Sequence, residues 1–491
     1  AQSKMSNSNM DSINLCNYIY KEYFGFLNSF DKQITRSLHE SGIRTRSVHS
    51  NGLWCCTILP AVLIIYNILY KVSLVYSIVA YISLGLLFDC ILFSLFLSVS
   101  CLVLQEHVYG GCLASSLVSA LLMYIFGIDL TSSFLFTLPT VVAFSTLLRV
   151  ALTRFQNTFT IGEAMVVSQS IVLFVVMTVG QFIHGSTDDE MDLIISTVNT
   201  VLSSVGIIVT ALYLMTDQQK NLLYLRNVVA GTLLFAIIMV HSLTGMDWIP
   251  RILTYVFLDD NRLKLFTFWI AIVALTICVL LVRTKLAVKA TTVTRKAFHI
   301  LASTVFLSGI LYDRKLMTLA AGVGLGLLIL VEALRKSGIE PAASALQSAF
   351  LVYSDEKDSG TFAMTPFYLY CGLACPLVVA PAACGQLDLL AGVLALGVGD
   401  TAASWFGSRY GFNKWTGNNK TLEGTTFNIL SQISTVYALQ LFDLIDARHA
   451  LLRTAVAATI SGLSEALTEQ VDNLVLPIIT LLGFQITWFL S

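Results

Sequence analysis

The sequence predicts an all-α fold, a polytopic transmembrane helical bundle of about 13 to 15 helices. Two observations predict it. Of the 491 residues, 56% are hydrophobic and only 12% are charged, whereas about a quarter of the residues in a soluble domain are charged. In addition, apolar runs recur from Leu53 to the C-terminus, and many approach the roughly 20 helical residues that cross a hydrocarbon core of ~30 Å.

The elements follow one another from a polar start. Residues 1–50 lack the apolar core of a cleaved signal peptide, and their aromatic stretch from Asn17 to Leu27 suits a membrane surface. Several of the apolar segments that follow are short, so we expect about one or two to be merged or re-entrant. These segments lie at 53–70, 72–88, 90–105, 108–126, 132–150, 163–183, 193–214, 226–243, 265–283, 298–312, 316–334, 362–382, 388–405, 425–445, 450–463 and 473–490.

Composition narrows the class of protein. The net charge of −1 argues against nucleic acid as a partner, because nucleic acid favours a basic surface. The 10 Cys include no CxxC pair and lie mostly in apolar runs, which is typical of small buried side chains rather than of metal ligands or disulfides. We divide the chain into a polar segment 1–50, helices 51–283 of unassigned role, and a catalytic transmembrane domain 284–491.

Polar residues of the second half gather in four segments, at 283–300, 332–360, 396–430 and 461–473. Ionisable groups are costly in a bilayer and mark functional sites. An even number of apolar helices separates each segment from the next, so all four face one side of the membrane. Their lysines and arginines outnumber those of the opposite turns, which makes that side cytosolic. Such a site suits an enzyme that meets a soluble substrate from the cytosol and a lipid from the bilayer.

The third segment contains the parts of a phosphate and metal site. In "GVGD", Gly397 and Gly399 would let backbone approach a ligand, and Asp400 is a carboxylate suited to Mg²⁺. In "NNKTLEGT", Lys420 is a cation for phosphate oxygens, and Glu423 is a second acid. The same residues would also suit a solvated loop between helices, and the chain has no GxxxxGK[ST] phosphate loop.

Other polar groups accompany this segment. If Thr421 opens the next helix, the free N–H groups of that helix also favour anions. A lone His at a helix start is usually structural, but His299 follows a basic run at a membrane face, where it could instead contact a phosphate or the nucleophile. Phosphoryl transfer depends on positioning and on charge neutralisation, and several acids with several bases suit it. The further acids and the amide are Asp355, Glu356, Asp358, Glu465, Asp472 and Asn473.

Five motifs resemble the dolichol kinases of the polyprenol kinase group. They are "RKAFHI", "SDEKDSG", "LGVGDTAASWFGSRYG", "NKTLEGT" and "EALTEQVDNLVLP". Their order and spacing agree over about Arg295 to Leu490, whereas the N-terminal half matches only through hydropathy and "FTIGEA". Two departures stand out: Asn419 replaces an expected second Lys, and Thr365 with Pro366 lies where the family tends to have a His.

The resemblance implies a multi-pass enzyme of the endoplasmic reticulum membrane, with its active site in the cytosol. It implies CTP-dependent phosphorylation of dolichol or another polyprenol, giving the lipid carrier for protein glycosylation, with Mg²⁺ or a similar cation. A groove between the later helices would hold the prenyl chain, and the general base stays open among Asp400, Glu465 and His299. The implied catalytic residues are Asp400, Lys420, Glu423, His299 and Glu465; the nucleotide site adds Gly397, Gly399, Thr401, Ser404, Gly417, Thr421, Gly424, Arg295, Lys296, Asp355 and Asn473; the metal ligands are Asp400, Glu423 and Asp472.

Other classes of protein remain open at this point. A cytidylyltransferase of the phosphatidate type would also use CTP, Mg²⁺ and a lipid, but it would release pyrophosphate. Another lipid or prenol kinase would differ in its acceptor. A transporter would place charges near the middle of its helices and carry inverted repeats, and neither is clear in the sequence. Oligomeric state and chain-length preference are not predicted.

Overall fold

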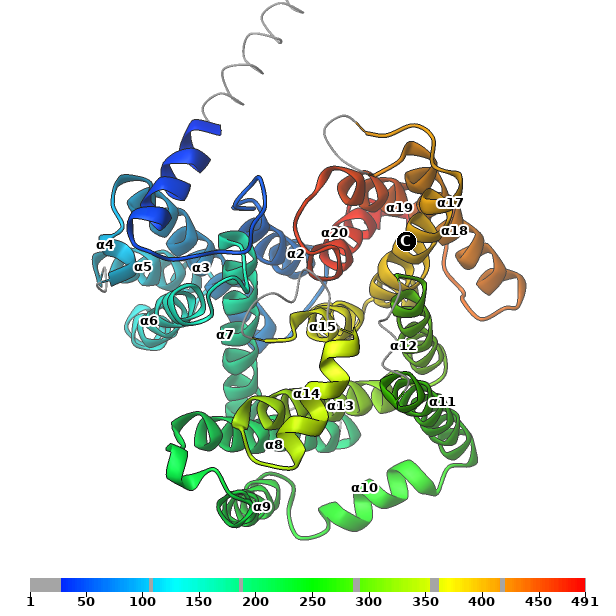
Figure 1. Cartoon of the computed structure of the whole chain (residues 1–491), viewed down its shortest axis with the longest axis horizontal. Helices are drawn as coiled ribbons and strands as arrows, with labels where there is room; N and C mark the ends of the chain where they lie inside the picture. Colours follow the sequence, from blue (N-terminus) through cyan, green and yellow to red (C-terminus); the bar gives the residue numbers. More distant parts are fainter. Residues whose placement is uncertain are drawn as a thin grey trace, which may run out of the picture. The chain divides into compact units, whose positions relative to one another are not determined.

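The structure, a computed structural model, describes residues 28–105, 109–184, 189–285, 292–353, 362–415 and 420–490. Within these ranges the regular structure is helical, without strands apart from one bridge between Lys414 and Thr421, which confirms the all-α prediction (Figure 1). Seven of the described helices are long and apolar enough to span a membrane, judged by length and composition. They are α3 (Leu74–Val99), α6 (Leu130–Arg154), α7 (Ile161–His184), α8 (Asp189–Leu214), α9 (Leu222–Thr244), α11 (Asp260–Lys285) and α13 (Arg314–Ser337).

The prediction of separate helices at 72–88 and 90–105 is wrong. One helix, α3, covers most of both segments. Asp89 stands at their junction and is buried. Its carboxylate accepts a hydrogen bond of 3.0 Å from the Ser115 hydroxyl on α5 (Tyr109–Ile125). A buried carboxylate is tolerated inside an apolar helix when it has a hydrogen-bond partner. Asp89 therefore does not mark the end of one helix and the start of the next.

Beyond residue 50, two described helices of ten residues or more were not predicted. The first is α10 (Trp248–Phe257), and the second is α14 (Ala342–Tyr353), which packs against α11 and α13. Gly338 ends α13 in the left-handed conformation, with φ of 72°, which favours glycine. Both new helices lie in stretches that are too short for a membrane crossing, so a search for long apolar runs passes over them.

The chain divides into two compact units, residues 1–56 with 82–172, and residues 57–81 with 173–491. In the first, the "FTIGEA" stretch opens α7: Glu163 accepts from the backbone N–H of Thr160 at 2.9 Å and pairs with Arg46 at 2.5 Å. Glu163 is fully buried, so this motif joins the chain before α2 (Cys55–Leu69) to α7. Residues 28–40 form a helix, and the aromatic stretch Asn17 to Leu27 lies outside the described residues.

The second unit contains every described residue of the predicted catalytic domain. At its centre is η3, a π-helix over Val393–Asp400, which packs against α12, α15, α18, α19 and α20. π-Helical turns are rare and often occur at functional sites. The remaining helices around it are α12 (Thr292–Tyr312), α15 (Met364–Val379), α16 (Gln386–Leu389), α17 (Thr401–Tyr410), α18 (Leu422–Leu441), α19 (Ala450–Leu467) and α20 (Asp472–Ile486).

Candidate active site

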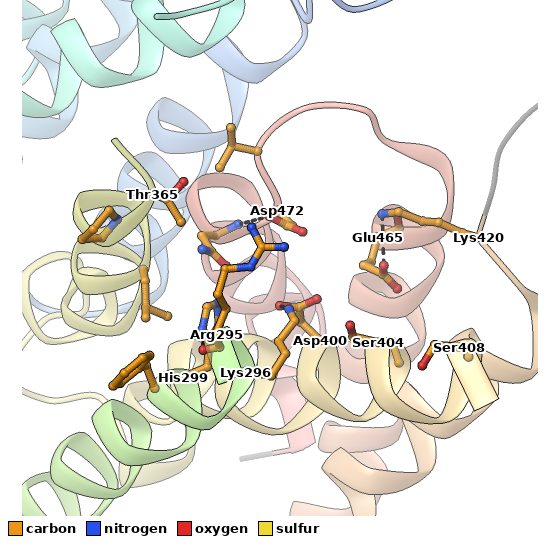
Figure 2. Close-up of a pocket in the computed structure, with 18 of the residues that line it drawn as sticks. Arg295, Lys296, His299, Thr365, Asp400, Ser404, Ser408, Lys420, Glu465 and Asp472 are labelled. Atoms are coloured by element: carbon orange, nitrogen blue, oxygen red, sulfur yellow. Dashed lines mark hydrogen bonds and ion pairs between the residues drawn. The ribbon is translucent and has the colours of Figure 1, made fainter. Parts of the chain in front are cut away.

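A cavity of about 650 Å³ lies in the second unit, between α11, α12, α14, α15 and the helices from α17 to α20. All four polar segments of the sequence contribute to its lining, the second one through Phe350. Figure 2 shows Thr365 on one side, Lys420 and Glu465 on the other, and Arg295, Asp400 and Asp472 between them. The predicted site residues that line the cavity are Arg295, Lys296, His299, Asp400, Ser404, Lys420, Thr421, Gly424, Glu465, Asp472 and Asn473.

The basic wall comes from the first turns of α12. Lys296 Nζ forms an ion pair with Asp400 Oδ2, and both side chains are largely buried. His299 is also buried, and its Nδ1 lies 3.0 Å from the backbone oxygen of Arg295. A carbonyl oxygen only accepts, so this contact places the ring proton on Nδ1 and leaves Nε2 as the acceptor of the neutral ring.

Asp400 stands where η3 passes into α17. Residues four apart share one helix face, and Asp400, Ser404 and Ser408 all line the cavity. Ser408 was missed from the sequence, although this spacing of four was a visible signal for it. The expected segment 388–405 is therefore helical over most of its length, and the helical wall continues as far as Tyr410.

The two glycines before Asp400 have a different role from the one predicted. A Cβ atom on Gly397 would overlap the side chain of Ser303, and one on Gly399 would lie 2.5 Å from Asn428 Oδ1. Thr401 donates its hydroxyl to the backbone oxygen of Leu396 at 3.2 Å. These three residues do not line the cavity. The glycines let η3 pack closely against α12 and α18 rather than let backbone approach a ligand.

The expected helix start at Thr421 is confirmed. Thr421 is the N-cap of α18, and its hydroxyl accepts the backbone N–H of Gly424 at 3.2 Å. Gly424 also allows the close crossing of α17, since a Cβ there would meet Ala403 O at 3.1 Å. The first turn of α20, at Asp472 and Asn473, lines the same cavity. Two helix N-termini thus face one space, an arrangement that favours a bound anion.

Lys420 precedes this helix and reaches the end of α19. Its Nζ lies 3.0 Å from Glu465 Oε1, and it also donates to the Glu465 backbone oxygen. Burial raises the pKa of the Glu465 carboxyl, while the charge of Lys420 opposes that rise. This end of the cavity therefore holds a lysine and a carboxylate that neutralise each other.

Glu423 does not join the other predicted acids, which corrects its assignment to the site. It is half-buried and lies outside the cavity lining. Its carboxylate accepts from the backbone N–H of Asn413 at 3.2 Å and from the Asn413 side chain at 2.8 Å. Hydrogen bonds from backbone N–H groups, its own first, hold its pKa below the usual value. Glu423 thus stabilises the loop before α18; Asp355 and Gly417, also predicted, lie outside the described residues.

The donors present fit a magnesium ion without forming a ready-made metal cluster. Among the described residues, no group of three or more His, Cys, Asp or Glu side chains could hold a metal. Mg²⁺ is usually held by one or two carboxylates together with substrate phosphates, and Asp400 and Asp472 supply two. Asn473 adds a buried Oδ1 for which no hydrogen-bond partner is present among the described residues. These oxygens are the hard donors that Mg²⁺ requires.

The comparisons with known proteins identify the family. The sequence model described as "Dolichol kinase" matches residues 78–370. The chain is 30% identical over 412 residues to dolichol kinase of Mus musculus, covering 79% of this chain and 77% of the relative. The chain belongs to the dolichol kinase family. It is also 31% identical over 346 residues to dolichol kinase of Homo sapiens, covering 66% and 64% of the two chains, and 26% identical over 251 residues to that of Saccharomyces cerevisiae, covering 50% and 46%. No solved structure matches.

The dolichol kinase match extends further toward the N-terminus than the motifs indicated. It begins within α3, so the helices that we had linked to the family only through hydropathy and "FTIGEA" are part of it. It ends at residue 370, within α15. The assignment of Asp400 and Lys420 thus rests on the motif resemblance and on the geometry of the cavity.

The cavity of this dolichol kinase family member also has an apolar side. The sequence predicted a groove between the later helices for the prenyl chain, but not the residues that form it. Thr276 and Leu280 lie four residues apart on α11, and Phe350 comes from α14. Phe298 and Leu369 complete this side. Apart from Thr276 and Leu280, α11 is mostly exposed and apolar. An apolar chain bound on this side of the cavity would therefore be separated from the lipid phase by one helix.

Proposed function

We propose that this protein is a dolichol kinase that transfers the γ-phosphoryl group of CTP to the hydroxyl of dolichol, forming dolichyl phosphate and CDP. The observation that supports this function best is the division of one cavity into two sides. Cations, acids and two helix N-termini meet on one side, and Phe298, Phe350 and Leu369 form the other. A water-soluble triphosphate and an apolar alcohol would meet where the two sides join. The family match, to kinases, does not favour a cytidylyltransferase or a transporter.

The cavity offers a group for each task in the transfer. Lys420 and Arg295, with the N-terminus of α18, would bind the phosphates. Asp400 and Asp472 would hold Mg²⁺, which when bound neutralises charge that develops on the phosphoryl oxygens. His299 is our choice of general base, because Asp400 and Glu465 already pair with lysines, whereas Nε2 of the neutral imidazole can accept the dolichol proton.

The function is tested by incubating the purified full chain with γ-labelled CTP, Mg²⁺ and dolichol and then extracting the lipid. We expect label in a lipid monophosphate and CDP in the aqueous phase, and we expect EDTA to abolish both. Release of pyrophosphate would indicate a cytidylyltransferase instead. A higher rate with ATP than with CTP would contradict the proposed donor.

Replacing Lys420 by Ala is expected to raise the KM for CTP by roughly ten- to a hundredfold, the range for losing a hydrogen bond to a charged group. High CTP concentrations should restore part of the rate. Lys414→Ala is the matched control, because Lys414 lies in the same loop, is exposed and does not line the cavity. An unchanged KM for CTP in Lys420→Ala would show that this lysine does not contact phosphate.

We propose that the cavity faces the cytosol from the endoplasmic reticulum membrane. The chain has one Asn-x-Ser/Thr sequon, at Asn419 to Thr421, and glycosylation takes place on the lumenal side. We therefore expect Asn419, which lies outside the described residues, to carry no glycan and the chain to keep its gel mobility after endoglycosidase treatment. A glycan at Asn419 would reverse the topology.

A labelling experiment tests the same orientation independently. Lys414→Cys and Asp446→Cys change two exposed positions in the turns before α18 and after it. In intact microsomes, an impermeant thiol reagent should label the first above the wild-type background, and the second only after the membrane is permeabilised. The opposite order of labelling would place the site in the lumen.

A further inference from the structure

The end of α13 carries a buried cluster that the proposed reaction does not use. Arg335 Nε donates to Glu332 Oε2 at 2.7 Å, and a second guanidinium nitrogen donates to Glu332 Oε1 at 2.6 Å. The third nitrogen donates to Gln347 Oε1 on α14 at 2.5 Å. Glu332 and Arg335 are both buried. The planar guanidinium therefore uses all of its sides to join two helices.

The same cluster reaches a third helix and one wall of the cavity. Glu332 Oε1 accepts the backbone N–H of Ala363, the N-cap of α15, at 2.9 Å. The guanidinium carbon of Arg335 lies 4.1 Å from the centre of the Phe350 ring, in a cation–π contact. Arg335 thus sets the position of Phe350, and Glu332 sets the start of α15.

The groups held in this way line the apolar side of the cavity. Phe350 comes from α14, and Thr365, Pro366 and Leu369 come from the first two turns of α15. Glu332, Arg335 and Gln347 are not in the lining. They can affect a bound molecule only through the helices that they join. Figure 2 shows Thr365, in the first turn of α15, on the side away from Lys420 and Glu465.

A buried ion pair of this kind is weak evidence for stability, because well-packed apolar side chains often serve as well. What the pair fixes is geometry. A bidentate guanidinium defines the distance and angle between its partners, and lysine does not reproduce that geometry. The cluster therefore fixes the separation of α14 and α15 to a degree that a purely apolar contact would not.

We propose that Glu332, Arg335 and Gln347 form a positioning element for the lipid acceptor, and that Phe350 contacts the hydroxyl-bearing end of its isoprenoid chain. This inference rests on the proposed function and adds the location of the acceptor. The element should affect the KM for the lipid and not the KM for the nucleotide, because the residues that it positions line only the apolar side of the cavity.

The first test separates the two substrates kinetically. Arg335→Lys keeps the charge and should raise the KM for dolichol by about tenfold, since it loses bidentate charge-assisted hydrogen bonds, while the KM for CTP changes less than about twofold. Lys336→Arg is the matched control on the same helix, because Lys336 is exposed, and it should leave both constants unchanged. An equal rise in both constants, or a loss of thermal stability with neither changed, would overturn the positioning role.

The second test depends on neither turnover nor the folding of an Arg335 variant. A polyprenyl alcohol with a photoactivatable group near its hydroxyl should label the peptide that contains Phe350, and unlabelled dolichol should compete. Phe350→Ala should weaken the labelling several-fold, whereas Leu351→Ala, at a residue that is 58% exposed, should not. Specific labelling elsewhere in a chain that phosphorylates dolichol would refute this inference alone. Absence of both competed labelling and lipid phosphorylation would refute the proposed function as well.

Discussion

Asp400→Asn is expected to reduce phosphoryl transfer roughly a thousandfold or more, since it removes the charge that would hold the proposed Mg²⁺ and stabilise the transferring group. The change keeps the size of the side chain, so the packing of η3 against α12 and α18 should persist. It also leaves Lys296 without its carboxylate partner. A reduced affinity for CTP alone would not account for the loss, because the expected fall is in kcat at saturating substrate.

The measurement is single-turnover transfer from labelled CTP by the purified variant, with gel filtration as the check on folding. Asp446→Asn is the control, because Asp446 is an exposed aspartate of the same unit and lies outside the cavity. Turnover by Asp400→Asn close to that of the wild type would remove Asp400 from the catalytic assignment.

Arg453→Met should have the largest effect on stability, about 3–5 kcal/mol in the free energy of unfolding, the range for breaking a buried pair. Arg453, in the first turn of α19, lies 3.2 Å from Asp388 of α16, and both side chains are almost completely buried. Removing the guanidinium leaves an uncompensated carboxylate in the protein interior, which costs far more than the lost contact itself.

Thermal unfolding in detergent micelles would measure this effect as a lower midpoint temperature. The double variant Asp388→Asn with Arg453→Met should recover most of the loss, because it also removes the stranded charge. Arg448→Met, two residues before α19 and exposed, should change little. A midpoint for Arg453→Met equal to that of the wild type would mean that the pair adds nothing to stability.

The sequence predicted those features that depend on local chemistry. Thr421 is a good N-cap residue ahead of an apolar run, and the structure has the helix start there. Asp400 and Lys420 stood out because charged groups between apolar segments are costly. A local pattern also indicated His299 beside two basic residues, and the cavity brings these three positions together.

Other features depend on contacts between distant residues, which spacing does not encode. Glu423 has the residue type and spacing of a ligand, but the same carboxylate serves equally well as a partner for Asn413. Phe350 belongs to a short helix, and its ring contacts Arg335 of another helix. The union of two apolar segments in α3 places Asp89 inside the helix, where a hydroxyl from another helix is its hydrogen-bond partner.

The pairing of charges around the cavity has a thermodynamic consequence. Among the described residues, its lining contains three cations, Arg295, Lys296 and Lys420, and three carboxylates, Asp400, Glu465 and Asp472, so the formal charge of this described lining is zero with a neutral His299. A nucleotide triphosphate arriving alone would make this space strongly negative, and a divalent cation arriving alone would make it positive. Each ligand therefore lowers the cost of admitting the other, and by linkage the affinity for one must rise with the concentration of the other by the same factor in both directions.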